Sequence, residues 1–198
     1  MTTIGSTSFF PAKPLGCYGD GGALFTNDRA LADRLKAIRV HGSEERYHHT
    51  CLGINGRLDA LQAAILKVKL SHLEEELRLR EEIGSRYTAS LREHCKTPTI
   101  EEEATHVFAI YTIRTPERDL LARELKEKGI PTGIYYPKPI YSQPGYSFLE
   151  VEKEAFPETE RACKEVISLP MHPWLDQESQ EQIIRSVQEA LKEAALCR

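Results

Sequence analysis

The chain has 198 residues, of which 40% are hydrophobic, and its 26 basic and 30 acidic side chains leave a net charge of −4. This composition is sufficient for a globular protein with a real core, and it lacks the concentrated positive charge with which proteins bind nucleic acids. No apolar run reaches the roughly 20 residues of a membrane span, and the first residues lack the pattern of a signal peptide. We therefore expect neither nucleic acid nor a membrane as a partner.

The five cysteines are odd in number, widely scattered and never arranged as CxxC: Cys17, Cys51, Cys95, Cys163 and Cys197. This spacing argues against both a disulfide framework and a zinc site. We expect no metal site, and a reducing compartment, the cytoplasm.

The first third of the chain predicts a strand, a tight glycine-rich turn and a second strand within residues 7–26. Asp28 as N-cap then predicts a helix that runs to about Val40, with apolar residues on one face. Residues 41–56 show no periodicity and predict an ordered loop. From Arg57 apolar residues recur at three- to five-residue steps, which predicts one or two long helices that continue to about Leu91 and connect two domains.

Beyond Pro98 strands and helices alternate, as is typical of a small α/β domain. The pattern predicts strands at 107–113, 132–136 and 166–169, a helix between Pro116 and Gly129, and a terminal amphipathic helix from Asp176.

Lys13 lies between Pro11 and Pro14, directly before a cluster of four glycines. The prolines fix the local backbone, and the glycines let the main chain come close to another group. A lysine on such a stiff, apolar segment is expected to be partly desolvated, which favours the neutral amine that forms Schiff bases. From the residues alone, a solvated loop lysine and a simple hairpin turn remain open alternatives.

Two sequence blocks carry a resemblance to a known family. The first reads Ser-Phe-Phe-Pro-Ala-Lys-Pro-Leu-Gly from Ser8, followed by Tyr-Gly-Asp-Gly-Gly-Ala from Tyr18. The second runs from Arg39-Val-His-Gly through Tyr47-His-His to Leu52-Gly-Ile-Asn-Gly-Arg-Leu-Asp-Ala-Leu-Gln-Ala-Ala-Ile-Leu. Together they closely resemble the DegT/DnrJ/EryC1/StrS family of sugar aminotransferases, which use pyridoxal 5'-phosphate (PLP). The sequence of these two blocks is most similar to that of the branch that aminates UDP-2-acetamido-2-deoxy-3-keto-glucuronate for cell-surface polysaccharide.

The resemblance implies roles for four residues near these blocks. Lys13 would hold PLP as a Schiff base and move the proton during transamination. Ser8 would donate its hydroxyl to the cofactor phosphate. Asn55 would reach the phosphate of the neighbouring subunit's cofactor, because the active site of this family lies across a homodimer interface. Arg57 would approach the same shared site and bind a carboxylate or sugar oxygens. Read without the resemblance, Asn55 is a turn residue and Arg57 a surface charge.

The resemblance also implies the substrates, which are a keto sugar nucleotide, by branch a UDP-sugar, and glutamate with 2-oxoglutarate as its product. Tyr135 and Tyr136 fall where relatives place an aromatic or histidine pair against the sugar, with Tyr135 at a position where histidine is common. Tyr47, His48 and His49 either line the substrate entrance or belong to a packed loop, and both interpretations stay open.

The fold implied is a partial PLP-dependent transferase fold of type I, in the α/β class. Residues 1–80 would be the C-terminal part of the large PLP-binding domain, with the linking helix, and residues 81–198 the small C-terminal α/β domain. Relatives begin far upstream, where they carry the phosphate cradle, the ring that stacks on the cofactor and the acid that protonates its nitrogen. Residues 1–12 contain no Asp or Glu. We therefore expect a truncated gene product, a split gene or an incomplete gene model.

Alone, such a chain would expose apolar surface and strand edges, bind the cofactor poorly and turn over no substrate. The alternative to an aminotransferase is a catalytically inactive fragment that acts only as a folded or dimerising module. A dehydratase of the same family is less favoured, because those relatives replace the lysine by histidine whereas this chain retains Lys13.

Overall fold

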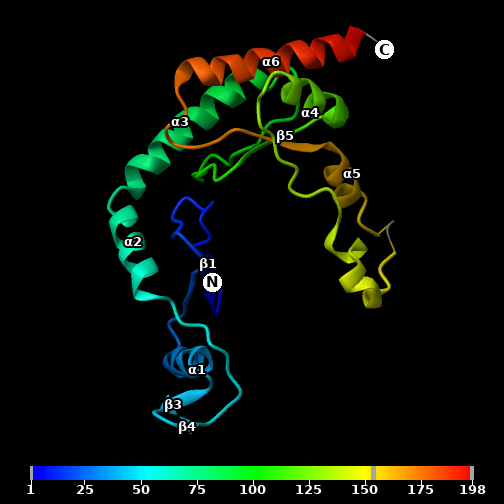
Figure 1. The fold of residues 1–198 in the computed structure, drawn as a ribbon. Coiled ribbons are helices and arrows are strands. Elements are labelled where there is room, and N and C mark those ends of the chain that lie inside the picture. The colour runs from blue at the N-terminus through cyan, green and yellow to red at the C-terminus, as the bar shows by residue number, and fades with distance from the viewer. Residues whose placement is uncertain (1, 153–154, 197–198) are drawn as a thin grey trace. The chain divides into compact units, whose positions relative to one another are not determined.

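The computed structural model describes residues 2–152 and 155–196, and the chain divides into two compact units, Met1–Glu75 and Glu76–Arg198. Figure 1 follows the chain from blue at its N-terminus to red at its C-terminus. The predicted domain assignment, with its boundary at residue 80, stays a prediction.

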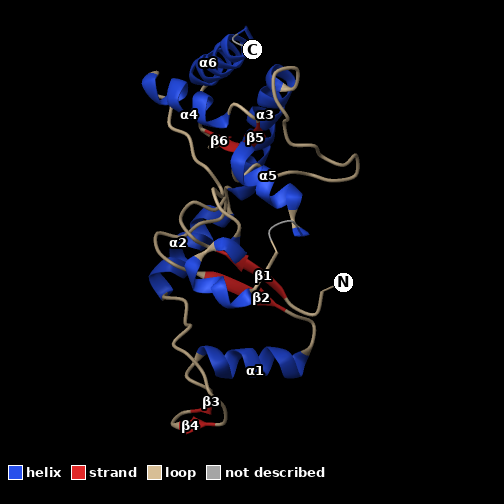
Figure 2. Ribbon diagram, turned by 90° about the vertical axis from the view of Figure 1, so that its right-hand side faces the viewer, coloured by secondary structure: helices blue, strands red, loops and turns tan. Residues whose placement is uncertain are grey.

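The first unit contains two short strand pairs and two helices, and the start of a third. Its elements are β1 (Gly5–Ser8), β2 (Gly22–Phe25), α1 (Arg29–Arg39), β3 (Ser43–Glu45), β4 (His48–His49), α2 (Ala60–Leu70) and the beginning of α3 (Leu73–Leu91). β1 pairs antiparallel with β2, with Gly5 opposite Phe25 and Ser8 opposite Gly22 (Figure 2). The predicted strand, turn and strand are thus confirmed.

α1 begins where the sequence predicts it. The side chain of Asp28 accepts a hydrogen bond from the backbone nitrogen of Leu31 at 3.0 Å, which satisfies one of the free donors in the first turn. The segment after the helix is an ordered loop with one addition, the small β3–β4 hairpin. A Cβ on Gly42 would lie 1.7 Å from the carbonyl oxygen of Cys51, and its φ is +74°, so only glycine fits this crossing of two backbones.

The predicted helical region after Arg57 forms two helices, α2 and α3. α2 ends at Leu70 and is capped by Ser71, whose hydroxyl donates to the carbonyl oxygen of Val68 at 2.7 Å. α3 starts at Leu73, two residues after Ser71. A side-chain oxygen that bonds back to the preceding turn competes with continued helix at this point.

The second unit contains the hydrophobic core. Its elements after α3 are β5 (Tyr111–Arg114), α4 (Arg118–Glu127), the short 3-10 helices η1 (Ile140–Ser142) and η2 (Pro144–Leu149), α5 (Pro157–Glu165), β6 (Val166–Leu169) and α6 (Gln177–Leu196). β5 and β6 pair antiparallel, and α4 packs against α6 (Figure 1). Fifteen of the described buried residues form the core, among them Tyr87, Tyr111, Leu121, Ile167 and Val187. They come from α3, β5, α4, β6 and α6 and, in the cases of Phe108 and Ile130, from the segments between them. The mixed α/β architecture confirms the predicted class.

Two predicted strands differ from the structure. Of residues 107–113 only the last three lie in β5, because Phe108 has a φ of +41° and its amide nitrogen bonds to Nδ1 of His106 at 3.0 Å, which interrupts the extended run. Residues 132–136 form no strand. Of these residues Gly133 alone pairs, with Ser168, and a segment with an internal glycine and a proline on either side, Pro131 and Pro137, has little tendency to extend such a ladder.

The helices α4 and α6 and the strand β6 agree with the sequence predictions. Gly129 follows α4 with a φ of +73°, and the amide nitrogen of Ile130 bonds to the carbonyl oxygen of Leu125 at 2.8 Å, as at a glycine-terminated helix. Asp176 accepts a hydrogen bond from the amide nitrogen of Ser179 at 2.8 Å and caps α6. α5, which begins at Pro157, was not predicted from the sequence.

Candidate active site

Lys13 lies on the turn that joins β1 to β2. Three backbone hydrogen bonds of 2.8 Å close this turn: Phe9 N to Gly21 O, Cys17 N to Phe9 O, and Lys13 N to Phe10 O. The amide nitrogen of Lys13 is therefore tied to the end of the strand segment that precedes it.

Glycine and cysteine fill the inside of this turn. A Cβ on Gly16 would lie 2.7 Å from the carbonyl oxygens of both Phe10 and Pro11, and one on Gly22 would lie 2.9 Å from that of Thr7. The Cys17 thiol is buried and lies 3.0 Å from the carbonyl oxygen of Phe9 and from that of Gly19, to which it can donate. Gly16 and Gly22 are thus required by close backbone contacts.

A residue that sequence reasoning missed connects this turn to α2. The amide nitrogen of Tyr18 donates to Oε1 of Gln62 at 2.8 Å, and a Cβ on Gly19 would lie 3.1 Å from the side-chain nitrogen of Gln62. The signal was present, because Gln62 is a polar residue within the apolar run between Leu61 and Leu66. A polar residue in such a run indicates a hydrogen bond to be satisfied.

Lys13 and Ser8 are both exposed in the described chain. The expected partial desolvation of Lys13 is wrong for this chain, because the interior of the turn is occupied by the Cys17 thiol and glycine backbone and not by the lysine side chain. The Oγ atom of Ser8 accepts from the amide nitrogen of Phe10 at 3.2 Å, so its own hydrogen is available to donate elsewhere.

Asn55 and Arg57 bond to each other. Nε of Arg57 donates to Oδ1 of Asn55 at 3.0 Å, and both residues are exposed. The backbone nitrogen of Gly56 bonds to the carbonyl oxygen of Arg39 at 2.9 Å, and Asn55 pairs with Val40, so this segment is fixed against the end of α1. Within the described residues, no hydrogen bond or ion pair joins this pair to Ser8 or Lys13.

Tyr135 and Tyr136 belong to the second unit. Their rings meet edge to face with centroids 5.8 Å apart, and their exposed fractions are 49% and 73%. A Cβ on Gly133 would lie 2.7 Å from the ring of Tyr135, so this ring packs directly on glycine backbone. The tyrosine pair is thus ordered and accessible.

Tyr47, His48 and His49 are exposed on and beside β4, and Tyr47 is 81% exposed. The packed-loop interpretation is therefore wrong for the described chain. The guanidinium of Arg46 lies 5.0 Å from the centre of the Tyr47 ring, and Nδ1 of His49 lies 3.0 Å from the carbonyl oxygen of His41. Their place at a substrate entrance stays a prediction.

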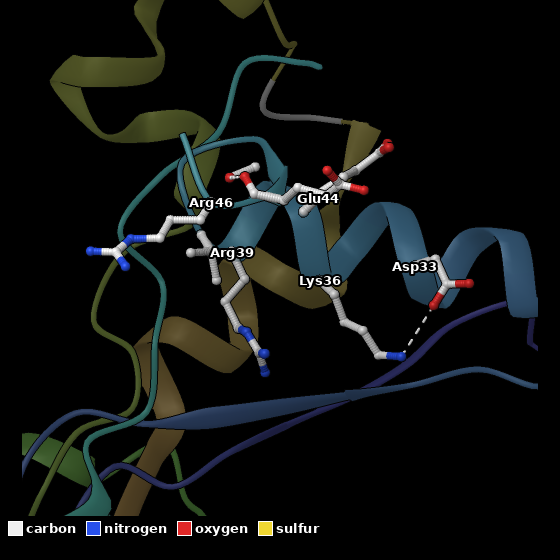
Figure 3. A pocket seen from close by; sticks show the side chains of 9 residues that line it. Asp33, Lys36, Arg39, Glu44 and Arg46 are labelled. Atoms are coloured by element: carbon white, nitrogen blue, oxygen red, sulfur yellow. Dashed lines mark hydrogen bonds and ion pairs between the residues drawn. The ribbon is translucent and has the colours of Figure 1, made fainter. Parts of the chain in front are cut away.

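A charged hollow of about 580 Å³ lies between α1 and the β3 segment (Figure 3). Lys36 is paired with Asp33 at 3.1 Å, and Figure 3 shows Arg39 and Arg46 pointing in different directions. Because its charges are mixed and its basic groups do not converge, the hollow offers no obvious anion site. It contains none of the predicted site residues.

Other reactive groups in the part of the chain that the structure describes give no second site. Cys17, Cys51, Cys95 and Cys163 carry free thiols, and burial raises the pKa of Cys95 to about 11, which makes it a weak nucleophile at neutral pH. Among residues 2–152 and 155–196, no cluster of three His, Cys, Asp or Glu side chains is placed to hold a metal ion. No helix in the same ranges is long and apolar enough to cross a membrane.

Solved structures of aminotransferases share this fold. The DegT DnrJ EryC1 StrS aminotransferase from Brucella abortus is 42% identical, with a TM-score of 0.90 over 94% of this chain and 50% of that chain. DesV from S. venezuelae is 34% identical, with a TM-score of 0.92 over 96% of this chain and 52% of that chain. The fold and the lysine-bearing turn therefore define part of a fold-type I aminotransferase.

Sequence comparison gives the family. Residues 1–188 match the DegT/DnrJ/EryC1/StrS aminotransferase family, so the chain belongs to it and the predicted resemblance is confirmed. The UDP-2-acetamido-2-deoxy-3-oxo-D-glucuronate aminotransferase of Pseudomonas aeruginosa is 48% identical over 177 residues, which are 89% of this chain and 48% of that protein. The chain spans about half the length of the curated relatives it matches.

Members of this family depend on PLP. NtdA from Bacillus subtilis was solved with bound cofactor PMP. It is 25% identical to this chain, with a TM-score of 0.86 over 96% of this chain and 46% of that chain. The residues described here fit part of this cofactor. The accessible amine of Lys13 suits its aldehyde, and the free hydroxyl hydrogen of Ser8, on the same strand and turn, suits its phosphate.

Proposed function

We propose that this chain is the lysine-bearing part of an aminotransferase that moves an amino group from glutamate to a keto sugar nucleotide for cell-surface polysaccharide synthesis. The observation that carries the proposal is Lys13 on a turn closed by hydrogen bonds and close glycine contacts, in a chain of this family. A UDP-sugar is favoured, because the relative whose name specifies a UDP-glucuronate is 48% identical, whereas a dTDP-sugar transaminase of Streptomyces venezuelae is 35% identical.

PLP, when bound, supplies an electron sink for the carbon that gains or loses the amino group. The chain's own residues hold this cofactor and move the proton. Nζ of Lys13 would hold the cofactor and would also hold the proton that passes to or from the substrate carbon. The hydroxyl of Ser8 would donate to the phosphate. The hydrogen bonds of the turn position Nζ, because the amide nitrogen of Lys13 is tied to Phe10.

The proposed enzyme is a homodimer that works in the cytoplasm. Asn55 and Arg57 are exposed and mutually oriented, which suits residues that reach a neighbouring subunit's site. Arg57 would bind a carboxylate or sugar oxygens through the guanidinium nitrogens that do not contact Asn55. Tyr135 and Tyr136 would contact the sugar. The free thiols of the described cysteines fit a reducing compartment.

The test uses the complete fold, obtained by joining this chain to the half of the Pseudomonas aeruginosa relative that lies outside the matched region. We call this the joined protein. With PLP and glutamate it should aminate a UDP-linked 3-keto sugar, and Lys13→Ala should abolish turnover. Lys138→Ala is the matched control, because Lys138 is also exposed and also lies between two prolines. Equal activity of the two variants would overturn the proposal.

A second candidate function is a non-catalytic module that only folds or dimerises. The exposure of Lys13 in this chain favours it. It predicts that the 198-residue chain, without any further polypeptide, forms no Schiff base with PLP and yet remains folded. A PLP absorbance band and glutamate-dependent amination by this chain alone would exclude the module.

A further inference from the structure

The turn that carries Lys13 is closed by its own backbone. The three backbone bonds that close it all join residues within 9–21. Of the hydrogen bonds described for these residues, only one leads to a helix, the bond from the amide nitrogen of Tyr18 to Oε1 of Gln62 at 2.8 Å. The internal bonds fix the shape of the turn, whereas the bond to Gln62 fixes its place against α2.

Two side chains at the start of α2 meet the second half of the turn. Gln62 lies in the first turn of α2, and a Cβ on Gly19 would lie 3.1 Å from its Nε2 atom. Cδ1 of Leu58, four residues earlier, would lie 3.0 Å from a Cβ on Gly21. The absence of a side chain at both glycines lets the backbone of the turn approach α2 closely. The turn is thus held by one hydrogen bond and by packing at two points.

The hydrogen bond contributes more to position than to stability. Tyr18 is 78% exposed, so water can replace Gln62 as the acceptor for this amide nitrogen. An apolar side chain at position 62 could fill the same space over Gly19. Neither replacement would hold Tyr18 at a fixed distance from α2. Loss of the Gln62 oxygen should therefore cost little stability and still release the turn.

A continuous path of contacts joins this bond to Lys13. The residue before Tyr18 is Cys17, whose amide nitrogen and thiol both bond to the carbonyl oxygen of Phe9, at 2.8 and 3.0 Å. The next residue, Phe10, accepts the bond from the amide nitrogen of Lys13 at 2.8 Å. A displacement at Tyr18 is therefore passed along these contacts to the backbone of Lys13.

We infer that Gln62 is a positioning residue, which holds the turn against α2 and thereby sets where Nζ of Lys13 lies when the cofactor is bound. It acts through the backbone of Tyr18 and not by contact with the cofactor. The inference rests on the proposed function, because it takes Lys13 as the residue that attaches PLP.

The test compares two changes at this position in the joined protein. Gln62→Met keeps the length of the side chain and removes the oxygen, whereas Gln62→Glu keeps an oxygen that can accept from Tyr18. Misplacement of a catalytic group by about 1 Å costs about 100-fold in rate, and a turn closed by its own bonds should move less. Gln62→Met should therefore lower kcat about tenfold with KM changed less than about twofold, and Gln62→Glu should keep kcat within about threefold.

Two readouts do not depend on turnover. In the 198-residue chain alone, hydrogen exchange at the amide of Tyr18 should be about tenfold faster in Gln62→Met than in the unchanged chain or in Gln62→Glu, because the bond that protects it is lost. In the joined protein, PLP attached to the Lys13 peptide is trapped with borohydride at successive times. Attachment should be about tenfold slower in Gln62→Met and nearly unchanged in Gln62→Glu.

Gln188→Met is the matched control. Gln188 is also half-buried, and its Nε2 atom donates to the carbonyl oxygen of Ser90 at 2.9 Å in the second unit. This variant loses a comparable bond between a glutamine and the backbone. It should lower the thermal unfolding midpoint at least as much as Gln62→Met and leave both kcat and the rate of PLP attachment unchanged.

Three results would overturn the inference. Equal exchange at Tyr18 in Gln62→Met and the unchanged chain would show that the bond does not hold the turn. Equal kcat in Gln62→Met and Gln188→Met would reduce Gln62 to a structural role, and a loss with Gln62→Glu as large as with Gln62→Met would exclude the oxygen as the cause. All three are judged against an active unchanged protein, whereas a joined protein with Gln62 intact that attaches no PLP at Lys13 and aminates no sugar is a failure of the proposed function.

Discussion

A single methyl group at Gly16 tests whether the turn holds Lys13 in one conformation. In Gly16→Ala the new Cβ would lie 2.7 Å from the carbonyl oxygens of Phe10 and Pro11 and 2.9 Å from the carbonyl carbon of Pro11. All three atoms are main chain, so a side-chain rotation cannot relieve the contacts. The backbone at Phe10 and Pro11 must move by several tenths of an ångström, and Lys13, whose amide nitrogen bonds to Phe10, must move with it.

The expected cost follows from this displacement. Overpacking against fixed atoms destabilises by about 1–3 kcal/mol, and a weakened backbone hydrogen bond adds about 1 kcal/mol. Misplacement of a catalytic group by about 1 Å costs about 100-fold in rate. We therefore expect kcat of the joined protein to fall roughly 10- to 100-fold, with the larger part of the loss in kcat and not in KM.

The assay is steady-state glutamate-dependent amination, with thermal unfolding measured on the same samples. Gly145→Ala is the control, because a Cβ there meets nothing within 4 Å and the φ of Gly145 is not positive. It should leave kcat and stability unchanged. If Gly16→Ala matches Gly145→Ala in kcat, the turn does not position the lysine and the reasoning fails.

Three further predictions concern other residues. In the joined protein, Arg57→Lys should raise KM for the keto sugar nucleotide about tenfold with kcat nearly unchanged, because lysine lacks the planar fork of donors. The double variant with Asn55→Ala should raise KM by less than the two single effects combined, since the two side chains bond to each other. Additive effects on KM would contradict the pairing. Leu121→Ala should lower the unfolding free energy of the full chain by about 2–5 kcal/mol in urea titration, because Leu121 is fully buried in the core of the second unit; a loss below about 1 kcal/mol would show that this core is not as described. Burial raises the pKa of Tyr111 to about 12, above the ordinary value of 10.0, so the folded state keeps a proton that the unfolded state releases, and stability should fall as pH rises above 10. Tyr111→Phe should flatten this fall, and a difference in tyrosinate absorbance between the folded unchanged chain and the folded variant that already appears at pH 10 would refute it.

The predictions that rest on short-range sequence patterns were the reliable ones. The cap at Asp28 and the glycine after α4 at Gly129 were predicted correctly, because each depends on residues within one or two helical turns. The strand expected at 107–113 was shortened by the left-handed backbone of Phe108, and the one at 132–136 was reduced to the single pairing of Gly133 with Ser168. The first outcome depends on the backbone conformation of one residue and the second on a pairing between distant segments, and hydrophobic periodicity encodes neither.

At the candidate site, too, short-range sequence patterns were informative and long-range contacts were not predicted. Lys13 stands out through its prolines, its glycines and its family motif, and the structure explains Gly16 and Gly22 by close backbone contacts. Gln62 was missed, because its bond to Tyr18 joins residues 44 positions apart. The expected desolvation of Lys13 was wrong for the described chain, because burial of a side chain depends on what packs over it and not on its sequence neighbours.

The most direct measurement is mass spectrometry of the joined protein after incubation with PLP and reduction by borohydride, which makes a Schiff base permanent. The account predicts a cofactor adduct on the peptide that contains Lys13, lost when Lys13 is replaced by alanine. An adduct on Lys138 or another lysine, with the Lys13 peptide unmodified, would contradict it.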